Sequence, residues 1–250
     1  MRVVVIQEPS AFAEYAATII EDALSDTATP TLGVATGNTP TDIYRQLASR
    51  GSLAPSTEVF GLDEYQGIDS VHSSSFARYI LDYVVQPCGL DSAALYLPPS
   101  SGTLEEIEDF EALHRQRSPL DIQILGVGRN GHIGFNEPGS SRDSTTRVVT
   151  LASETREDNR ESFGGDVPET AITQGVATIL RARKLLLVAR GSSKAQAIAQ
   201  LVRGEVSDLW PVTYLASHPG LIVLCDESAA SLLARNDYSV VDSVGQPGVL

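Results

Sequence analysis

The sequence predicts an α/β fold, a doubly wound and mostly parallel sheet in a single domain, and three observations support this prediction. Short apolar runs rich in β-branched residues recur along the 250 residues. Amphipathic helical patterns lie between most of these runs. The runs are apolar throughout, as in strands that helices cover on both faces, and no repeat or Gly/Ser linker divides the chain.

The expected strands and helices alternate along most of the chain. The strands cover 2–6, 31–35, 58–62, 121–126, 184–189 and 221–225. The helices cover 9–24, 41–48, 75–85, 103–115, 193–202 and 228–233. Ligands of such sheets bind beyond the carboxyl ends of the strands, so functional residues are expected in the loops that follow the strands.

A polar segment interrupts this alternation after residue 139. Ser, Arg, Asp and Glu cluster there and Gly164-Gly165 follow, so about 139–172 is interpreted as a helical lid that moves over a binding site. The domain is expected to span 1–234. The last residues, 235–250, are weakly patterned and are interpreted as a C-terminal tail.

Composition excludes several classes of protein. The formal net charge of -14 opposes sequence-independent binding of nucleic acid, and an anionic substrate would need a local cationic pocket. Cys88 and Cys225 form no C-x-x-C pair, and His72, His114 and His218 show no metal-ligand spacing, so neither disulfides nor a metal site is expected. No apolar run suits a secretory signal or a membrane span, which favours a soluble cytoplasmic protein.

Two loops at the starts of helices are candidates for binding a phosphate. Gly37, Asn38 and Thr39 follow the strand at 31–35 and open a helix that Thr39 is expected to cap. The free N–H groups and the positive end of the helix dipole would face an anion in this loop. A strand-to-helix turn with a good cap would have the same local sequence.

The second loop, 191–194, follows the strand at 184–189 and adds an ammonium group. Its Lys194 is one of only two lysines in the chain. Arg156, in the expected lid, could grip a phosphate through two parallel hydrogen bonds. Taken singly, each side chain is also compatible with an ordinary exposed residue.

A glycine-rich stretch carries the candidate acid and base groups. Residues 126–131 match the dinucleotide-binding pattern G-x-G-x-x-G, but no helical pattern follows and Pro138 soon ends the stretch, so a dinucleotide site is not expected. His132 and Glu137 lie on the same loop and could form a proton-transfer pair. A structural histidine beside a loop carboxylate is the alternative.

Asp63 is a further candidate base, because it directly follows the strand at 58–62. This position would place a carboxylate at the carboxyl end of a second strand, where ligands bind. An aspartate that caps a turn at the start of a loop is the alternative.

Together these stretches resemble the glucosamine-6-phosphate deaminase family. The motif GRNGHIGFNEP within 121–141 is specific, and its neighbours occur in the order of the family. The other matching stretches are 32–47 (LGVATGNTPTDIYRQL), 59–68 (VFGLDEYQGI), 175–180 and 191–195.

The resemblance implies a modified Rossmann-like fold, shared with sugar-phosphate isomerases and lactonases, and an activity that needs neither a cofactor nor a metal. It implies that Asp63 shuttles a proton and that Asn130, His132 and Glu137 open the sugar ring. It places five residues near the substrate phosphate: Gly37, Asn38, Thr39, Arg156 and Lys194.

Two departures from the family pattern limit these implications. Many members have Asp where this chain has Asn130, and an amide does not readily take up a proton. Allosterically activated hexamers of the family use a basic residue where this chain has Val149, although Arg147 is kept. A monomer or small homo-oligomer without strong activation is therefore expected.

The expected function is conversion of D-glucosamine 6-phosphate and water into D-fructose 6-phosphate and ammonia, in amino sugar catabolism. The partner is a small sugar phosphate, with no nucleic acid and no membrane. Three alternatives stay open: a galactosamine-6-phosphate deaminase, a 6-phosphogluconolactonase and a noncatalytic sugar-phosphate sensor. The lactonases continue their loop with Leu-Phe-Pro, unlike this chain, and sensors usually carry a basic DNA-binding helix pair.

Overall fold

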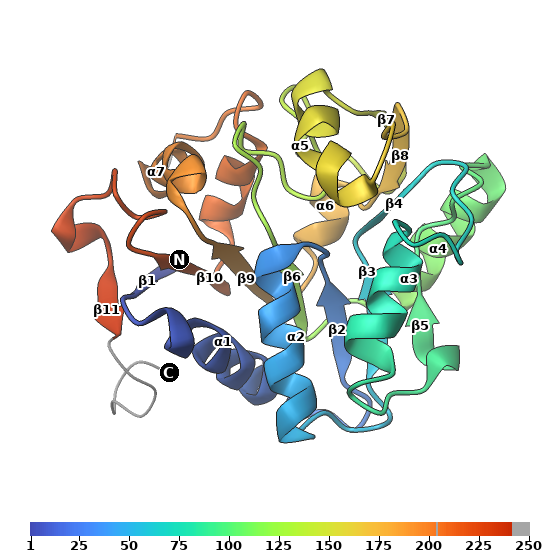
Figure 1. Cartoon of the computed structure of the whole chain (residues 1–250), viewed down its shortest axis with the longest axis horizontal. Helices are drawn as coiled ribbons and strands as arrows, with labels where there is room; N and C mark the ends of the chain where they lie inside the picture. Colours follow the sequence, from blue (N-terminus) through green and yellow to red (C-terminus); the bar gives the residue numbers. More distant parts are fainter. Residues whose placement is uncertain (204, 242–250) are drawn as a thin grey trace.

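The computed structural model describes residues 1–203 and 205–241, which build two sheets (Figure 1). The larger sheet is parallel throughout. Its strand order is β11 (Ser239–Val241), β1 (Arg2–Ile6), β10 (Leu221–Asp226), β9 (Lys184–Ala189), β6 (Ile122–Leu125), β2 (Thr31–Val34), β3 (Glu58–Gly61) and β5 (Leu95–Tyr96). The smaller sheet is antiparallel, in the order β4 (Asp63–Tyr65), β8 (Thr170–Thr173) and β7 (Arg147–Thr150).

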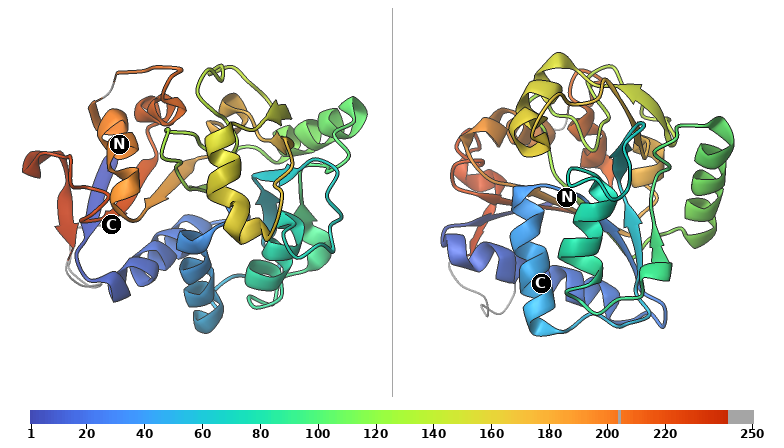
Figure 2. Two further views of the ribbon diagram at one scale, coloured as in Figure 1. Left: turned by 45° about the horizontal axis from the view of Figure 1, so that its top comes forward. Right: turned by 45° about the vertical axis from the view of Figure 1, so that its right-hand side comes forward.

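Helices cover both faces of the larger sheet, so the predicted doubly wound α/β fold is confirmed (Figure 2). One face carries α1 (Pro9–Leu24), α2 (Asn38–Arg50) and α3 (Phe76–Ile80), which continues as the π-helical turn Leu81–Val85. The other carries α4 (Leu104–Arg117), α6 (Val176–Ile179) and α7 (Ala195–Arg203).

Several strands of the larger sheet contribute side chains to the cores on both of its faces. Along β1, Val4 and Ile6 pack into the core under α1 and α2, whereas Val3 and Val5 pack into the core under α7. Successive side chains of a strand point to opposite faces, so a strand covered on both sides is apolar at every position. This is why the strands read as continuous apolar runs.

The predicted strands are all present, and no strand end differs from its expected position by more than one residue. The sequence did not predict β5, β11 or the antiparallel sheet. β11 lies in the segment interpreted as a tail and pairs with β1, while residues 242–250 of that segment lie outside the described residues. A strand of three residues, such as β11, is too short to show a recognisable sequence pattern. It forms because its backbone hydrogen-bonds to the neighbouring strand β1.

The helix predicted at 228–233 is wrong, because this segment forms turns. The Asp226 carboxylate accepts from the N–H of Ala229, and the Asp226 carbonyl accepts from the N–H of Ala230. These isolated turn hydrogen bonds stand in place of a helical ladder. The helical patterns at 9–24, 41–48, 75–85, 103–115 and 193–202 correspond to helices, most of them with shifted ends.

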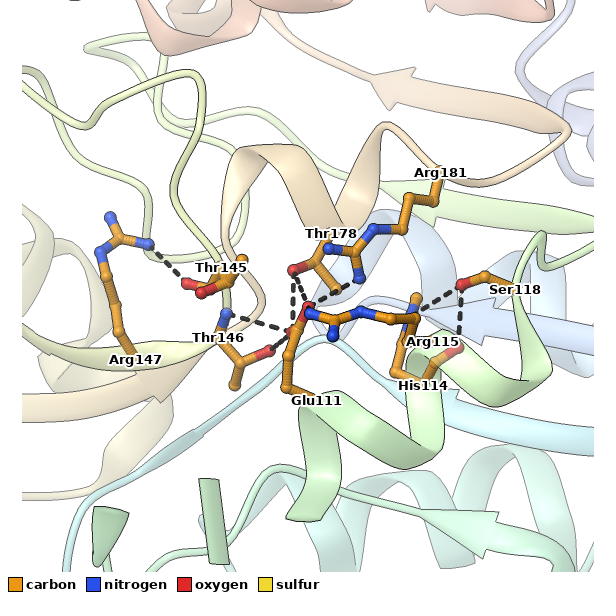
Figure 3. A network of polar contacts seen from close by, with 9 residues as sticks. All are labelled: Glu111, His114, Arg115, Ser118, Thr145, Thr146, Arg147, Thr178 and Arg181. Carbon is orange, nitrogen blue, oxygen red and sulfur yellow. Dashed lines mark hydrogen bonds and ion pairs between the residues drawn. The ribbon is translucent and has the colours of Figure 1, made fainter. Parts of the chain in front are cut away.

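A buried carboxylate anchors the antiparallel sheet to the main body (Figure 3). Glu111 on α4 accepts hydrogen bonds from the hydroxyls of Thr146 and Thr178 and from the guanidinium of Arg181, the last at 2.6 Å. Burial alone would raise the pKa of Glu111, but these hydrogen bonds outweigh it and lower the pKa. The network joins α4, α6 and the residue before β7.

The segment interpreted as a lid contains β7, enters β8 at its end and has α5 (Ser153–Phe163) between them. Figure 1 shows α5 above the carboxyl edge of the larger sheet. Its sequence is polar, and Thr155 is the single residue of the helix that is buried. Among the described helices, none combines the length and the hydrophobicity needed to cross a lipid bilayer.

Candidate active site

A cavity of about 720 Å³ opens at the carboxyl edge of the larger sheet. The loops after the four adjacent strands β9, β6, β2 and β3 line it, and α5 borders it as well. This is the position at which such sheets bind ligands. Five of the residues singled out in the sequence line this one cavity: Gly37, Asn38, Asp63, His132 and Lys194.

Asp63 presents a buried and unpartnered carboxylate to the cavity. It is the first residue of β4 and only 7% exposed, and none of the described residues donates a hydrogen bond to its side chain. Burial, with a smaller contribution from the charge of Glu64, raises the pKa of Asp63 from 3.8 to about 8. A carboxyl group with a pKa near neutrality is suited to take up and release a proton.

The next residue, Glu64, is fully engaged elsewhere. Its carboxylate accepts from the hydroxyl of Ser75 at 2.7 Å and from the N–H groups of Phe76 and Ala77. These N–H groups belong to the first turn of α3, so Glu64 satisfies donors that have no partner within the helix. Two adjacent carboxylates therefore have separate roles, and only Asp63 is free to react.

His132 is held by a connected set of hydrogen bonds behind the cavity wall. Its Nδ1 lies 3.4 Å from Oε2 of Glu137, and the same oxygen accepts from the amide of Asn130 at 2.8 Å. Asn130 also accepts from the backbone N–H of His132 through its Oδ1. On α5, the hydroxyl of Thr155 donates to Oε1 of Glu137 at 2.5 Å.

Glu137 is consequently held as a carboxylate. Burial taken alone raises its pKa, but hydrogen bonds from His132, Thr155 and Asn130 lower the pKa of Glu137 to about 2. An ionised Glu137 accepts the Nδ1–H of the imidazole, which leaves Nε2 to exchange a proton with a ligand in the cavity. The amide of Asn130 thus orients the pair without titrating itself.

Glycines in the loop make room for this arrangement. A Cβ atom on Gly128 would lie 2.3 Å from the imidazole ring of His132, which no side chain tolerates. Gly131 adopts a φ of +81°, a conformation that favours glycine. The stretch 126–131 is followed by turns and not by a helix, as its sequence predicted.

The start of α2 also lines the cavity. Helix α2 begins at Asn38 with Gly37 as its N-cap, so the expected cap by Thr39 is wrong, and Thr39 lies outside the cavity lining. With a φ of +117°, Gly37 turns the chain sharply out of β2. The N–H groups of the first helical turn have no partner within the helix and favour an anion at this position.

Lys194 provides a cation in the lining of the same cavity. It lies at the end of the 3-10 turn Ser192–Lys194 and lines the cavity. Burial lowers the pKa of Lys194; the nearby carboxylate of Asp158 opposes this effect and the guanidinium of Arg129 adds to it. Arg129 forms an ion pair with Asp158, with its Nε 2.9 Å from Oδ2.

Arg156 does not reach this cavity, contrary to the role that the resemblance implied for it. Its guanidinium donates to the carbonyl of Val167 and to Glu169, and it lines a separate cavity of about 200 Å³. Helical geometry explains this placement, because residues three or four positions apart share a face and Arg156 lies on a different face from Thr155 and Asn159. The face of α5 that lines the large cavity carries Thr155, Asp158, Asn159, Ser162 and Phe163.

Sequence reasoning missed these residues of α5. Asn159 donates to the hydroxyl of Tyr65 at 3.0 Å, and the ring of Phe163 lies edge-on to Tyr65. Their spacing at 155, 158, 159 and 162 was the available signal. It was hidden because the helix is polar on both faces, so no apolar stripe marked the inner one.

The chain is similar to known enzymes over nearly its whole length. Residues 8–223 match the model of the family described as glucosamine-6-phosphate isomerases/6-phosphogluconolactonase. A glucosamine-6-phosphate deaminase of Cutibacterium acnes is 40% identical, covering 95% of this chain and 94% of that protein. One of Rhodopirellula baltica is 41% identical, covering 93% and 95%.

Solved structures give the same result at the level of the fold. A monomeric glucosamine-6-phosphate deaminase superposes with a TM-score of 0.89 at 38% identity and covers 93% of this chain and 100% of that one. A 6-phosphogluconolactonase of Trypanosoma cruzi superposes with a TM-score of 0.77 at 15% identity, covering 93% and 97%. At that identity the second likeness concerns the fold alone.

Proposed function

The chain belongs to the family of glucosamine-6-phosphate isomerases and 6-phosphogluconolactonases, and from this premise we infer that it is a glucosamine-6-phosphate deaminase. It converts D-glucosamine 6-phosphate and water into D-fructose 6-phosphate and ammonia. The observation that carries this assignment is a single cavity whose lining combines a free buried carboxylate and an oriented imidazole with a helix start suited to an anion. We call these two sets of residues the catalytic end (Asp63 and His132) and the phosphate end (Gly37, Asn38 and Lys194).

We propose that His132 opens the sugar ring. Its Nε2 accepts the proton of the anomeric hydroxyl and passes it to the ring oxygen, so that the C1–O5 bond breaks and C1 becomes an aldehyde. Glu137 stabilises the imidazolium that forms in between through the bond to Nδ1. The contacts of Glu137 with Asn130 and Thr155 support this role, because they keep it ionised.

Asp63 then transfers a proton between two carbons. As a carboxylate it removes the proton from C2, and the bonding pair forms the C1–C2 double bond while the π pair of the C1 aldehyde moves to O1, which takes a proton from water. When Asp63 returns its proton to C1 of this enolamine, the nitrogen lone pair forms the C2=N bond, and water hydrolyses the resulting iminium to the ketone and ammonia. The absence of a hydrogen-bond donor within the described residues and the pKa of about 8 support this role for Asp63.

At the other end, the proposed contacts hold the substrate phosphate without taking part in the reaction. Gly37 and Asn38 offer backbone N–H groups and Lys194 offers its ammonium. We do not retain Arg156 in this set, because its side chain lies in the separate cavity.

We also propose a domain organisation, a location in the cell and an oligomeric state for this protein. We propose that residues 1–234 act as one domain, that 139–172 is a lid which moves over the cavity, and that the protein works in the cytoplasm. A monomer is supported by the likeness to a monomeric deaminase. Val149 adds to this support, because it packs against the small apolar cluster around Tyr65 and Phe135.

A coupled assay tests the activity. Ammonia and fructose 6-phosphate are measured together with glucosamine 6-phosphate, galactosamine 6-phosphate and 6-phosphogluconolactone as alternative substrates. Stoichiometric release of both products from glucosamine 6-phosphate is expected. Faster turnover of the galactosamine epimer or of the lactone would assign one of those activities instead, and binding without turnover would indicate a sensor.

A further inference from the structure

Thr155 is the point at which α5 touches the proton-transfer pair. Its hydroxyl donates to Oε1 of Glu137 at 2.5 Å and lies 3.5 Å from Nδ1 of His132. It is also the one residue of α5 that is buried. Of the contacts that α5 makes within the described residues, these are the ones that reach His132 and Glu137.

The protons available at this junction fix the direction of each bond. An ionised carboxylate only accepts, so the single proton of the Thr155 hydroxyl goes to Glu137. The hydroxyl oxygen then faces Nδ1 of His132 as an acceptor, as does Oε2 of Glu137. Both neighbours favour a proton on Nδ1, which leaves the lone pair of Nε2 for the cavity.

The rest of α5 is held by contacts that do not reach the pair. Asp158 binds Arg129, Asn159 binds Tyr65, and the carbonyl of Phe163 accepts from Ser74. If α5 leaves this position, Glu137 loses its contact with Thr155 and keeps those with Asn130 and His132. Oε1 of Glu137 thus contacts the lid segment, whereas Oε2 contacts the loop after β6.

We propose that Thr155 is a positioning residue that couples the seating of α5 to the Glu137–His132 pair, so that the pair is fully prepared for proton transfer only while α5 lies over the cavity. This inference rests on the proposed function for its catalytic meaning. The coupling itself is a property of the substrate-free protein and is measurable without turnover.

The test compares Thr155→Val, which keeps the shape and removes the hydroxyl, with Thr155→Ser, which keeps the hydroxyl. The titration of Glu137 is followed by NMR in the full-length protein labelled with ¹³C at the glutamate carboxyl carbons. The pKa of Glu137 is expected to rise in the valine variant and to stay near that of the wild type in the serine variant. In the coupled assay, kcat of the valine variant is expected to fall about 10- to 100-fold, with much of the loss restored by serine.

Arg160→Ala is the matched control on the same helix, because Arg160 lies on the face away from the large cavity. It should change neither measurement. An unchanged Glu137 titration in the valine variant, or equal losses in the valine and serine variants, would overturn the coupling. A shifted titration in a protein that shows no deaminase activity would instead uphold the coupling and overturn the proposed function.

Discussion

The catalytic end and the phosphate end of the cavity are built in different ways. At the catalytic end, His132 and Glu137 are held by hydrogen bonds from two segments of the chain, the loop after β6 and α5, and Asp63 is left buried without a hydrogen-bond donor among the described residues. At the phosphate end, Lys194 lies near a carboxylate of the protein, Asp158, which is already paired with Arg129. The proposed acid and base groups are thus organised in the substrate-free protein, whereas a phosphate bound as we propose would compete with the carboxylate of Asp158 for Lys194.

The strongest test of this contrast is Asp63→Asn. An amide of the same shape cannot carry the proton from C2 to C1, so kcat is expected to fall about 1,000-fold or more. The affinity for glucosamine 6-phosphate, measured by calorimetry on the inactive variant, should stay within a few-fold of the KM of the wild type. Retained turnover would remove Asp63 from the mechanism.

The same variant is expected to respond differently to pH. A carboxyl whose pKa is raised from 3.8 to about 8 on folding contributes stability that is fully present below pH 4 and is lost as the pH rises through 8. The amide that replaces this carboxyl carries no charge at any pH, so Asp63→Asn should lose less stability over this window. Tm measured from pH 5 to 9 for both proteins checks the prediction.

A smaller effect on the catalytic end is expected from Gly128→Ala. The added methyl group would lie 2.3 Å from the ring of His132, so the imidazole must move away from Glu137. We expect kcat to fall about 100-fold with a smaller change in KM. In Gly126→Ala the methyl group meets no atom within 4 Å, and a much smaller loss is expected.

At the phosphate end, Lys194→Ala should raise KM about 10-fold or more and change kcat less, because the lost contact is the same in the ground state and in the transition state. Lys184 is a matched control, since it lies at the opposite, amino end of the same strand. An unchanged KM in Lys194→Ala would place the phosphate elsewhere.

The smallest expected effect is a decrease in KM, opposite in direction to the increase expected for Lys194→Ala. Asp158→Asn removes the internal anion and frees Arg129 and Lys194, so KM is expected to fall by a few-fold, most clearly at low salt. Glu157→Gln removes a carboxylate from the outer face of α5 and should leave KM unchanged. A higher KM in Asp158→Asn would show that Asp158 binds the substrate itself.

The larger sheet was predictable from the sequence because strands that are buried on both faces are apolar at nearly every position. The antiparallel sheet was not, since β4 contains two carboxylates and residues of β7 alternate between half-buried and exposed. The same difference in burial pattern decided which site residues could be recognised from the sequence. Asp63 and His132 follow apolar strands, which marked them as cavity residues, whereas Thr155 lies on a polar helix in which no pattern distinguished it from its neighbour Arg156.

The two adjacent carboxylates of β4 show how much depends on the pairing of one short strand. Asp63 lies opposite Thr173 and Glu64 opposite Ile172 in the ladder with β8. Because side chains alternate along a strand, a slip by a single position would turn Glu64 toward the sugar and Asp63 toward the start of α3. A deletion of one residue just before β4 would therefore exchange a reactive group for a structural one, although the chain would still contain both.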